Sequence, residues 1–196
     1  MPRYFRYFPT TKHQGQLLLD ITKRAKFKNT IAENPRVYLP YTVKNDESAE
    51  EVAHLYYGDV NLVWLVYLAN DIIDPYKDWP MEQENFYDYV ADKYKEEYKE
   101  STGSATAPRQ LVLDWTMNET IDDNVLYYEN DDGDQISLET FTLGATFDPD
   151  FDADEWSKMT VFRVENVENE NKRQIQVINK IYAEQVDKEF KRLMND

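Results

Sequence analysis

Eight consecutive apolar residues, Leu62 to Ala69, constrain the fold of this chain more than any other feature. The run reads Leu-Val-Trp-Leu-Val-Tyr-Leu-Ala and is far too short to cross a bilayer. A helix that is apolar on every side has to be buried on every side. A module of about fifty residues buries only about 60% of its surface, so such a module alone can hardly enclose this helix. Either the rest of the chain or a partner must cover it.

The residues around this run predict a strand followed by two helices. The strand is expected over Tyr41–Lys44. Ser48 is placed to cap the first helix, and Glu51, three residues on, completes a capping box. Gly58 stands where the end of a helix favours a left-handed residue. The second helix is expected over Asn61–Ala69 and should end at Asn70.

The composition suits a folded chain with extensive interfaces. A length of 196 residues allows one or two domains, and the 15 tyrosines suit contact surfaces in which aromatic side chains anchor a partner. Because there is no cysteine, disulfides and thiolate chemistry are excluded. The first residues lack the apolar core of a signal peptide, so we expect synthesis in a cytoplasm and no membrane segment.

The net charge of −16 is unevenly distributed. Residues 1–30 contain seven basic residues and one acid, whereas residues 110–157 contain fourteen acids and no Lys or Arg. A polyanion repels phosphate backbones, so we expect no nucleic-acid binding. The basic N-terminal arm is suited to an acidic surface of a partner. The alternative is a solvated tail that only improves solubility.

The remaining segments give local predictions. Mixed charges over residues 92–100 indicate an exposed helix, and residues 101–108 have linker composition. Residues 147–156 are acidic, aromatic and expected to be irregular. We expect a half-buried strand over 111–117, a hairpin formed by 125–128 and 136–143, and a last strand over 161–164. One apolar stripe predicts a C-terminal helix that contains Ile175, Ile178, Tyr182, Val186, Phe190 and Leu193.

The sequence offers no catalytic constellation. The two histidines, His13 and His54, have no ligand neighbours at useful spacing. Asp131, Asp132 and Asp134 lack the register and the closing Glu of an EF-hand. We therefore expect no enzyme activity, no catalytic residue, no metal and no cofactor.

The strand–helix–helix order, with Gly58 between the helices and the Asn70 exit, resembles a LysM module. A larger set of motifs resembles the LysM-containing baseplate wedge proteins of bacteriophages with contractile tails. These motifs are Tyr4-Phe5, Phe8-Pro9, Asp20 to Arg24, Tyr41-Thr42-Val43, Glu51-Val52-Ala53, Tyr56 to Asp59, Trp64, Ala69 to Pro75, Asp78-Trp79-Pro80 and Lys93-Tyr94.

This resemblance implies an α+β fold: a LysM-like β-α-α(-β) module with an N-terminal extended arm, a small β-rich acidic region and a C-terminal amphipathic helix. The expected segments are the arm (1–39), the LysM-like domain (40–92), a charged helix and linker (93–108), the acidic hairpin region (109–164) and the C-terminal helix (165–196).

The resemblance also implies a structural role as a late virion protein of the tail baseplate, assembled in the host cytoplasm. Such proteins grip the helical core bundle of a wedge and help neighbouring wedges close into a six-fold ring around the hub. We would expect six copies per baseplate, in hetero-oligomeric contact with other wedge subunits and possibly with the hub.

Partner contacts are expected from the arm and from the two loops that flank the LysM-type groove. The candidate residues are Arg3, Tyr4, Phe5, Tyr7, Phe8 and Arg24 in the arm, and Asp46, Glu47, Asn70, Asp71, Ile72, Ile73 and Trp79 around the groove. Self-packing of the arm is the competing interpretation, and Trp64 and Trp79 are more typical of a core.

Two other functions stay open. A LysM module can bind peptidoglycan or chitin oligosaccharides. Here, however, residues 74–81 lack the alternation of a closing strand, which must be short or irregular, and this weakens sugar binding. The acidic stretch could also act as a DNA-mimicking decoy, although Trp115, Phe141 and Phe147 suit packing better.

Overall fold

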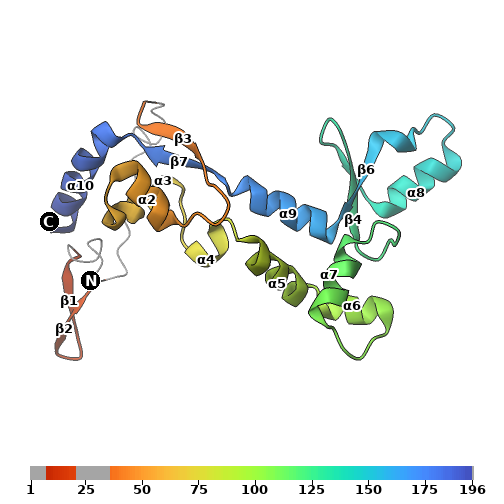
Figure 1. Cartoon of the computed structure of the whole chain (residues 1–196), viewed down its shortest axis with the longest axis horizontal. Helices are drawn as coiled ribbons and strands as arrows, with labels where there is room; N and C mark the ends of the chain where they lie inside the picture. The colour runs from red at the N-terminus through yellow and green to blue at the C-terminus, as the bar shows by residue number, and fades with distance from the viewer. Residues whose placement is uncertain (1–7, 21–35, 196) are drawn as a thin grey trace. The chain divides into compact units, whose positions relative to one another are not determined.

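The computed structural model of the protein describes residues 8–20 and 36–195 (Figure 1). The chain forms two compact units. Unit 1 contains residues 1–80 and 172–196, and unit 2 contains residues 81–171. Unit 2 is thus an insertion in the sequence of unit 1. Both units combine helices with strands, so the α+β class is confirmed. The five expected segments divide the chain differently, because 93–108 and 109–164 both lie inside unit 2.

Unit 1 begins with a β-hairpin where an extended arm was expected. β1 (Thr10–His13) pairs antiparallel with β2 (Gln16–Leu19). The turn residues Gln14 and Gly15 have φ values of 49° and 80°, which is the geometry of a tight two-residue hairpin turn. An extended arm is therefore wrong for residues 10–19.

The first strand of the expected module is present, but its partner comes from the far end of the chain. β3 (Tyr38–Thr42) pairs antiparallel with β7 (Gln174–Ile178). Residues 74–81 contain no strand and form the short helix α4 (Pro75–Asp78) instead. Unit 1 therefore has the order β3-α2-α3-β7, with unit 2 inserted before the last strand (Figure 1).

The local signals for the two helices of unit 1 are confirmed. α2 (Ala49–Tyr57) has Ser48 at its N-cap, and the Ser48 and Glu51 side chains form the reciprocal capping box. Gly58 closes the helix with φ 79°. After the 3-10 turn η2 (Val60–Leu62), helix α3 covers Val63–Ala69.

The chain itself covers the apolar helix. Trp64, Leu65 and Val66 are buried, and the remaining α3 residues are half-buried. Two clusters of unit 1 enclose them, and their buried members are Phe8, Val37, Trp64, Leu65, Ile178, Ala183 and Phe190 in one, and Val43, Val52, Ala53, Val66, Ile175 and Val177 in the other. Of the two ways to cover α3, burial by the rest of the chain is the one found.

The C-terminal helix is shorter than expected. α10 covers Lys180–Asn195, and the expected helical residues Ile175 and Ile178 lie in β7. Ile175 and Val177 alternate with exposed residues, as a half-buried strand requires. The helix prediction for residues 175–178 was wrong because the apolar residues of this short segment fit the spacing of a helix as well as that of a strand.

Unit 2 has a helical core where a strand had been expected. Its helices are α5 (Gln83–Lys93), α6 (Lys95–Thr102), α7 (Arg109–Met117) and α9 (Val161–Asn171). The strand predicted over 111–117 is wrong. Val112, Leu113, Trp115 and Thr116 are buried, and this spacing places them on one face of a helix. The strand predicted over 161–164 is also wrong, because these residues begin α9.

A three-stranded antiparallel sheet completes unit 2. β4 (Val125–Asn130) lies between β5 (Gln135–Ile136) and β6 (Trp156–Thr160). The turn at residues 130–134 is confirmed, but the second strand of the hairpin ends at Ile136. From there the chain forms α8 (Leu138–Phe147), capped by Ser137. Residues 148–155 are irregular apart from the 3-10 turn η3 (Ala153–Glu155).

Candidate functional site

A groove was expected in unit 1 between the loop before α2 and the loop after α3. In the structure a tryptophan joins these two loops. Trp79 Nε1 donates to the Glu47 carbonyl over 3.0 Å. The Glu47 side chain is buried and accepts from Tyr41 Oη at 2.7 Å and from Lys44 N at 2.9 Å. Burial, and then the Glu47 hydrogen bond, raise the pKa of Tyr41 to about 12. Glu47 and Trp79 thus hold the loops in place.

Asn70 also makes internal hydrogen bonds. Its Nδ2 donates to the carbonyls of Val66 and Gln176, each at 2.8 Å, and its Oδ1 accepts from Gln176 N at 2.8 Å. The Asn70 side chain thus both donates to and accepts from the backbone of Gln176, as a neighbouring strand would at the edge of β7. Asn70 connects the end of α3 to a strand 106 positions later in the sequence.

The residues after Asn70 form a tight exit that exposes apolar groups. Asp71 has φ 53°, and Ile72 N donates back to the Tyr67 carbonyl at 2.9 Å. The Asp78 carboxylate accepts from the backbone of Asp74 and Ile73, and these bonds lower its pKa. The loop is therefore well ordered, yet the Ile73 side chain is 72% exposed.

An aromatic surface adjoins this exit. Tyr76 is 90% exposed, which is unusual for so large a ring. Tyr67 is half-buried, and burial, then the charges of Glu50 and Tyr76, raise its pKa to about 12. We call Ile73, Tyr76 and the exposed Asp71 the exit patch. Such a patch can make apolar and stacking contacts, with acidic groups at its border.

The structure describes only part of the predicted arm. Arg3, Tyr4, Phe5, Tyr7 and Arg24 lie outside the described residues. Phe8 is 5% exposed and packs against Phe190, with 6.2 Å between ring centroids. Phe190 in turn lies 4.7 Å from Trp64. Phe8 is therefore a core residue of unit 1, and Asp46 is an exposed turn residue with φ 60°.

Unit 2 contains a buried ionic network. Glu165 is 6% exposed and accepts hydrogen bonds from Lys93 Nζ and from Tyr94 Oη at 2.7 Å. Burial acts to raise the pKa of Glu165, but the hydrogen bonds from Lys93 and Tyr94 outweigh it and lower that pKa. The network connects the end of α5 to α9.

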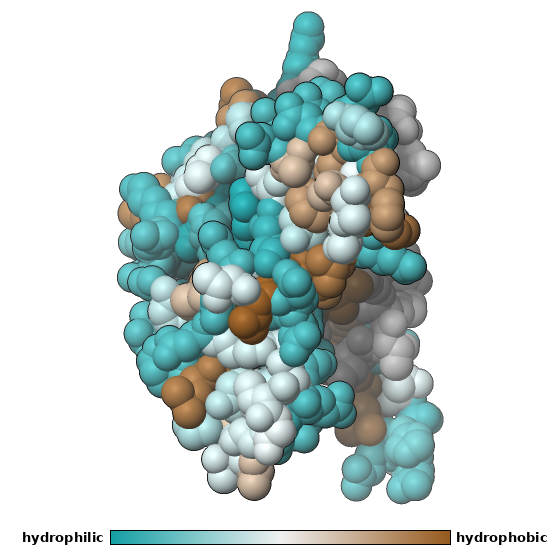
Figure 2. All heavy atoms as spheres, turned by 90° about the vertical axis from the view of Figure 1, so that its right-hand side faces the viewer, coloured by the Kyte–Doolittle hydropathy of each residue, from teal (hydrophilic) through white to brown (hydrophobic). Residues whose placement is uncertain are grey.

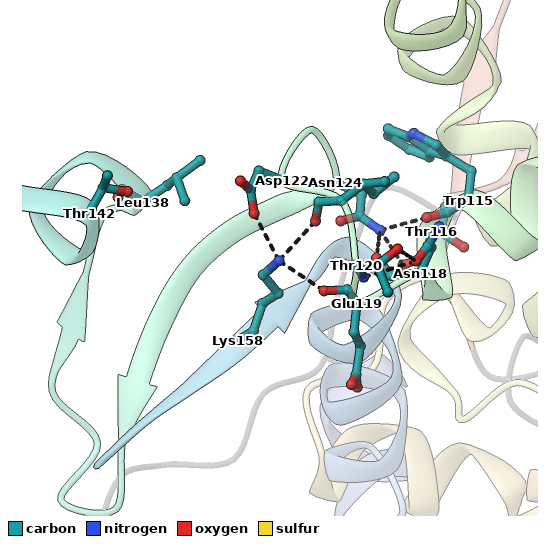
Figure 3. Close-up of polar contacts among 11 residues, drawn as sticks. Trp115, Thr116, Asn118, Glu119, Thr120, Asp122, Asn124, Leu138, Thr142 and Lys158 are labelled. Atoms are coloured by element: carbon teal, nitrogen blue, oxygen red, sulfur yellow. Dashed lines mark hydrogen bonds and ion pairs between the residues drawn. The ribbon is translucent and has the colours of Figure 1, made fainter. Parts of the chain in front are cut away.

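A second polar network fixes the loop after α7 (Figure 3). Lys158 Nζ donates to the carbonyls of Glu119 and Ile121 and to Asp122 Oδ1, each over 2.9 Å. Fully buried Asn124 donates from Nδ2 to the carbonyls of Trp115 at 2.6 Å and Asn118 at 2.8 Å. Lys158, the first cation after the acidic stretch, is thus bound to the loop between α7 and β4.

The acidic part of unit 2 presents a helix face that the sequence reasoning missed. α8 has no buried residue, and its inner side contacts the sheet through Phe141, whose ring stacks on Tyr128 at 3.8 Å. On the other side Leu143 is 51% exposed and Phe147 77% exposed. Figure 2 faces the side of Figure 1 that carries α8 and shows apolar atoms set among hydrophilic ones.

Within the described part of the chain, no group of three or more His, Cys, Asp or Glu is placed to hold a metal ion. None of the helices in that same part combines the length and the apolar character that a bilayer span requires. The described surfaces expose large apolar side chains at the exit patch and on the outer face of α8.

Comparison with known proteins gives two matches. The family model described as base plate wedge protein 53 matches residues 18–103, which is 86 of the 196 residues. The matched range extends from β2 to the end of α6. Over 55 residues, the chain is 38% identical to the baseplate wedge protein gp53 of Enterobacteria phage T4, a stretch that covers 28% of each protein. The alignment thus spans little more than a quarter of that relative's length.

Proposed function

We propose that this protein is a structural subunit of a phage tail baseplate wedge. The observation that carries the proposal is the match of residues 18–103 to the baseplate wedge family, supported by the 38% identity to the T4 protein. The matched range contains the two loops and the exit patch. The protein is then a virion component that is assembled in the host cytoplasm and has no catalytic role.

The proposed mechanism is multivalent clamping of neighbouring subunits. The β3-α2-α3-β7 unit acts as a LysM-like head, and the exit patch contacts the helical core of the wedge. Arg3, Tyr4, Phe5, Tyr7 and Arg24 extend this contact from the N-terminal region. Several modest contacts on one chain strengthen one another through effective concentration. Repeated six times around the hub, they join wedges into a ring.

Substitution of the exit patch tests this mechanism. The double variant Ile73→Ser and Tyr76→Ser removes two exposed side chains, so the fold should be unaffected. Because exposed apolar anchors dominate binding, we expect at least about tenfold weaker co-sedimentation with purified wedge subcomplexes of the same phage. Leu55→Ser with Ile181→Ser is the matched control, since these side chains are 64% and 80% exposed on other parts of unit 1. Equal binding by both double variants would remove the exit patch from the proposal.

The arm needs a truncation that spares the core. Deletion of residues 1–30 would also remove Phe8, and with it a buried ring beside Phe190. Deletion of residues 1–7 is therefore the better variant. It should lower wedge binding while the thermal unfolding midpoint stays unchanged. Undiminished binding would show that these residues have no part in docking.

Glycan binding is the second candidate, favoured by one observation. Tyr76 is 90% exposed in the segment after α3 of the β-α-α-β unit, and such a ring can stack on a sugar. However, Glu47 and Asn70, which belong to the two loops expected to flank the sugar, already use their polar groups in internal hydrogen bonds. We expect no heat on titration with N-acetylglucosamine oligomers, and saturable heat that Tyr76→Ser abolishes would favour the glycan function instead.

A further inference from the structure

The outer face of α8 has the exposed apolar side chains of a surface that binds a partner. Its inner side packs on its own unit, since Phe141 stacks on Tyr128 and a Cβ at Gly144 would lie 2.7 Å from the Phe151 ring. The outer side carries Leu143 and Phe147, 51% and 77% exposed, and we call this pair the α8 patch. Two large apolar side chains on one exposed helix face are typical of a surface that becomes covered.

The charge around the α8 patch restricts what can cover it. Residues 110–157 contain fourteen acids and no Lys or Arg, and the acids next to the patch, at positions 139, 148 and 150, are exposed. Lys158, the nearest following cation, donates to the loop at 119–122. An apolar partner with acidic borders would be repelled. The fitting partner has apolar side chains flanked by Lys or Arg.

The N-terminal hairpin has this chemistry. All residues of β1 and β2 are exposed except Leu19, which is half-buried. Leu17 is 68% exposed and Leu18 45% exposed, and exposed Lys12 lies opposite Leu17 in the register. A two-stranded hairpin is only marginally stable in water, so it gains from a surface to lie on. Successive strand residues point to opposite faces, so Leu17 and Lys12 share one face of the hairpin and Leu18 lies on the other. We call Leu17 and Lys12 the hairpin patch.

The charge distribution adds to this match. Residues 1–30 carry seven basic residues and one acid, a balance of +6. Since the whole chain carries −16, residues 31–196 carry −22. The only strongly basic segment of the sequence therefore surrounds the hairpin patch, and the longest segment without a cation surrounds the α8 patch. Opposite fields of this kind promote encounter and fix orientation.

We propose that the hairpin patch of one copy docks on the α8 patch of a second copy of this chain. The contact joins two different surfaces, so it is heterologous and leaves one unused patch at each end of a pair. Repetition closes a ring or extends a chain, which gives the ring in the proposed function a direct contact between copies. In that respect the inference rests on the proposed function, but it is tested with the purified protein alone.

Sedimentation velocity of the full chain over a range of concentrations provides the first test. We expect reversible association that weakens when the ionic strength is raised from about 0.05 M to about 0.5 M, because surface charges are then screened. Leu17→Thr with Leu18→Thr keeps the strand propensity of β2 and removes the exposed leucine of the hairpin patch together with the one on the opposite face of the hairpin. Leu143→Gln with Phe147→Gln keeps the helix propensity of α8 and removes the α8 patch. Each double variant should associate at least about tenfold more weakly.

A mixture of the two double variants provides the decisive test. The hairpin variant still has its α8 patch, and the α8 variant still has its hairpin patch. Mixed at a concentration at which each variant alone is monomeric, they should form a one-to-one complex and nothing larger. Leu55→Gln with Ile181→Gln should associate as the wild type does, because it changes exposed apolar residues outside both patches.

Three outcomes would overturn the inference. In the first, the wild-type chain stays monomeric at every concentration, as it would if the hairpin occupied the α8 patch of its own copy. In the second, one double variant associates as strongly as the wild type, as a contact between two like patches would allow. In the third, the mixture forms no complex. None of these outcomes affects wedge binding, which the exit-patch variant tests.

Discussion

At the scale of single residues, the stability of unit 2 depends on the ion pair between Lys93 and the buried carboxylate of Glu165. Because the network lowers the pKa of Glu165 below 4.5, the ionised carboxylate stabilises unit 2 above that pH, and the contribution is lost as the pH falls through the folded-state pKa. Lys93→Met leaves the carboxylate buried without its cation. We expect the free energy of unfolding to fall by about 3 kcal/mol at pH 7.

The pH dependence separates this effect from lost packing. In Lys93→Met, burial dominates and should raise the pKa of Glu165 above 4.5. The deficit relative to the wild type should therefore start to shrink as the pH falls through this raised pKa, and it should shrink further below pH 4.5, where the wild type loses its own contribution. Urea unfolding at pH 7 and pH 4 measures it. Lys95→Met is the control, because its ion pair with Asp92 is exposed to solvent and contributes little to stability. A deficit of the same size at both pH values would contradict the ionic explanation.

Asn70 makes a second prediction at this scale. Asn70→Ala removes three hydrogen bonds and leaves the backbone of Gln176 to water, because this part of the contact is exposed. We expect a loss of about 1–2 kcal/mol in the free energy of unfolding and faster amide exchange at Gln176. Asp71→Asn is the control, since Asn also adopts positive φ. Unchanged exchange at Gln176 would show that Asn70 does not hold β7.

These residues also show which features of the candidate site could be predicted from the sequence. The loops were identified from turn residues next to predicted helices, and their positions proved correct. What their polar side chains contact could not be predicted, because the partners are distant in sequence: Gln176 for Asn70, and Trp79 for Glu47. The exposed Tyr76 was missed, since a Tyr beside a Pro carries no signal of exposure.

At the scale of elements, α8 depends on a close approach between Gly144 and Phe151. A Cβ at this position would lie 2.7–3.0 Å from three atoms of the Phe151 ring, which also stacks on Trp156. Gly144→Ala would gain up to about 1 kcal/mol of helix propensity. The displaced ring should cost about 1–3 kcal/mol, so we expect net destabilisation.

Thermal unfolding of Gly144→Ala and of Thr146→Ala compares the two effects directly. Thr146 is exposed on the same helix, so its substitution changes propensity without a clash and should be neutral or slightly stabilising. If Gly144→Ala also raises the unfolding midpoint, the approach of α8 to Phe151 is looser than described.

The predicted elements were correct where local chemistry decides the structure. Ser48, Glu51 and Gly58 act within a few residues, so α2 could be predicted with both ends. Residues 111–117 were predicted as a strand and form a helix, whereas residues 175–178 were predicted as a helix and form a strand. Both errors have the same cause. A short apolar segment fits period two and period 3.6 alike, and its environment decides: α7 packs in a helical core, whereas β7 pairs with β3.

The closing strand could not be predicted at the scale of the whole molecule. Tyr38 and Ile178 are paired, yet unit 2 lies between them in the sequence. Nothing local distinguishes a strand that completes a distant module from the start of the helix that follows it. The apolar run at α3 did indicate that a covering segment must exist, and β7 and α10 supply it.

An inserted unit should fold by itself if its two ends lie together. Asn169 accepts from Met81 N at 2.8 Å and donates to the Met81 carbonyl at 3.2 Å, so both connections of unit 2 meet at one hydrogen-bonded pair. Its core is drawn from α5, α6, α7 and α9, which all belong to unit 2. Insertions with adjacent ends are the ones that host domains tolerate.

Replacing residues 81–171 by a Gly/Ser linker of about five residues should therefore leave unit 1 folded. β7 would still pair with β3, because the register from Tyr38–Ile178 to Thr42–Gln174 involves unit 1 alone. Amide exchange over residues 174–178 of the excised variant should match that of the full chain. Residues 81–171 expressed alone should unfold in one cooperative transition. If instead both fragments are unfolded and the full chain melts in a single step, each unit depends on the other, and the two form one cooperative domain.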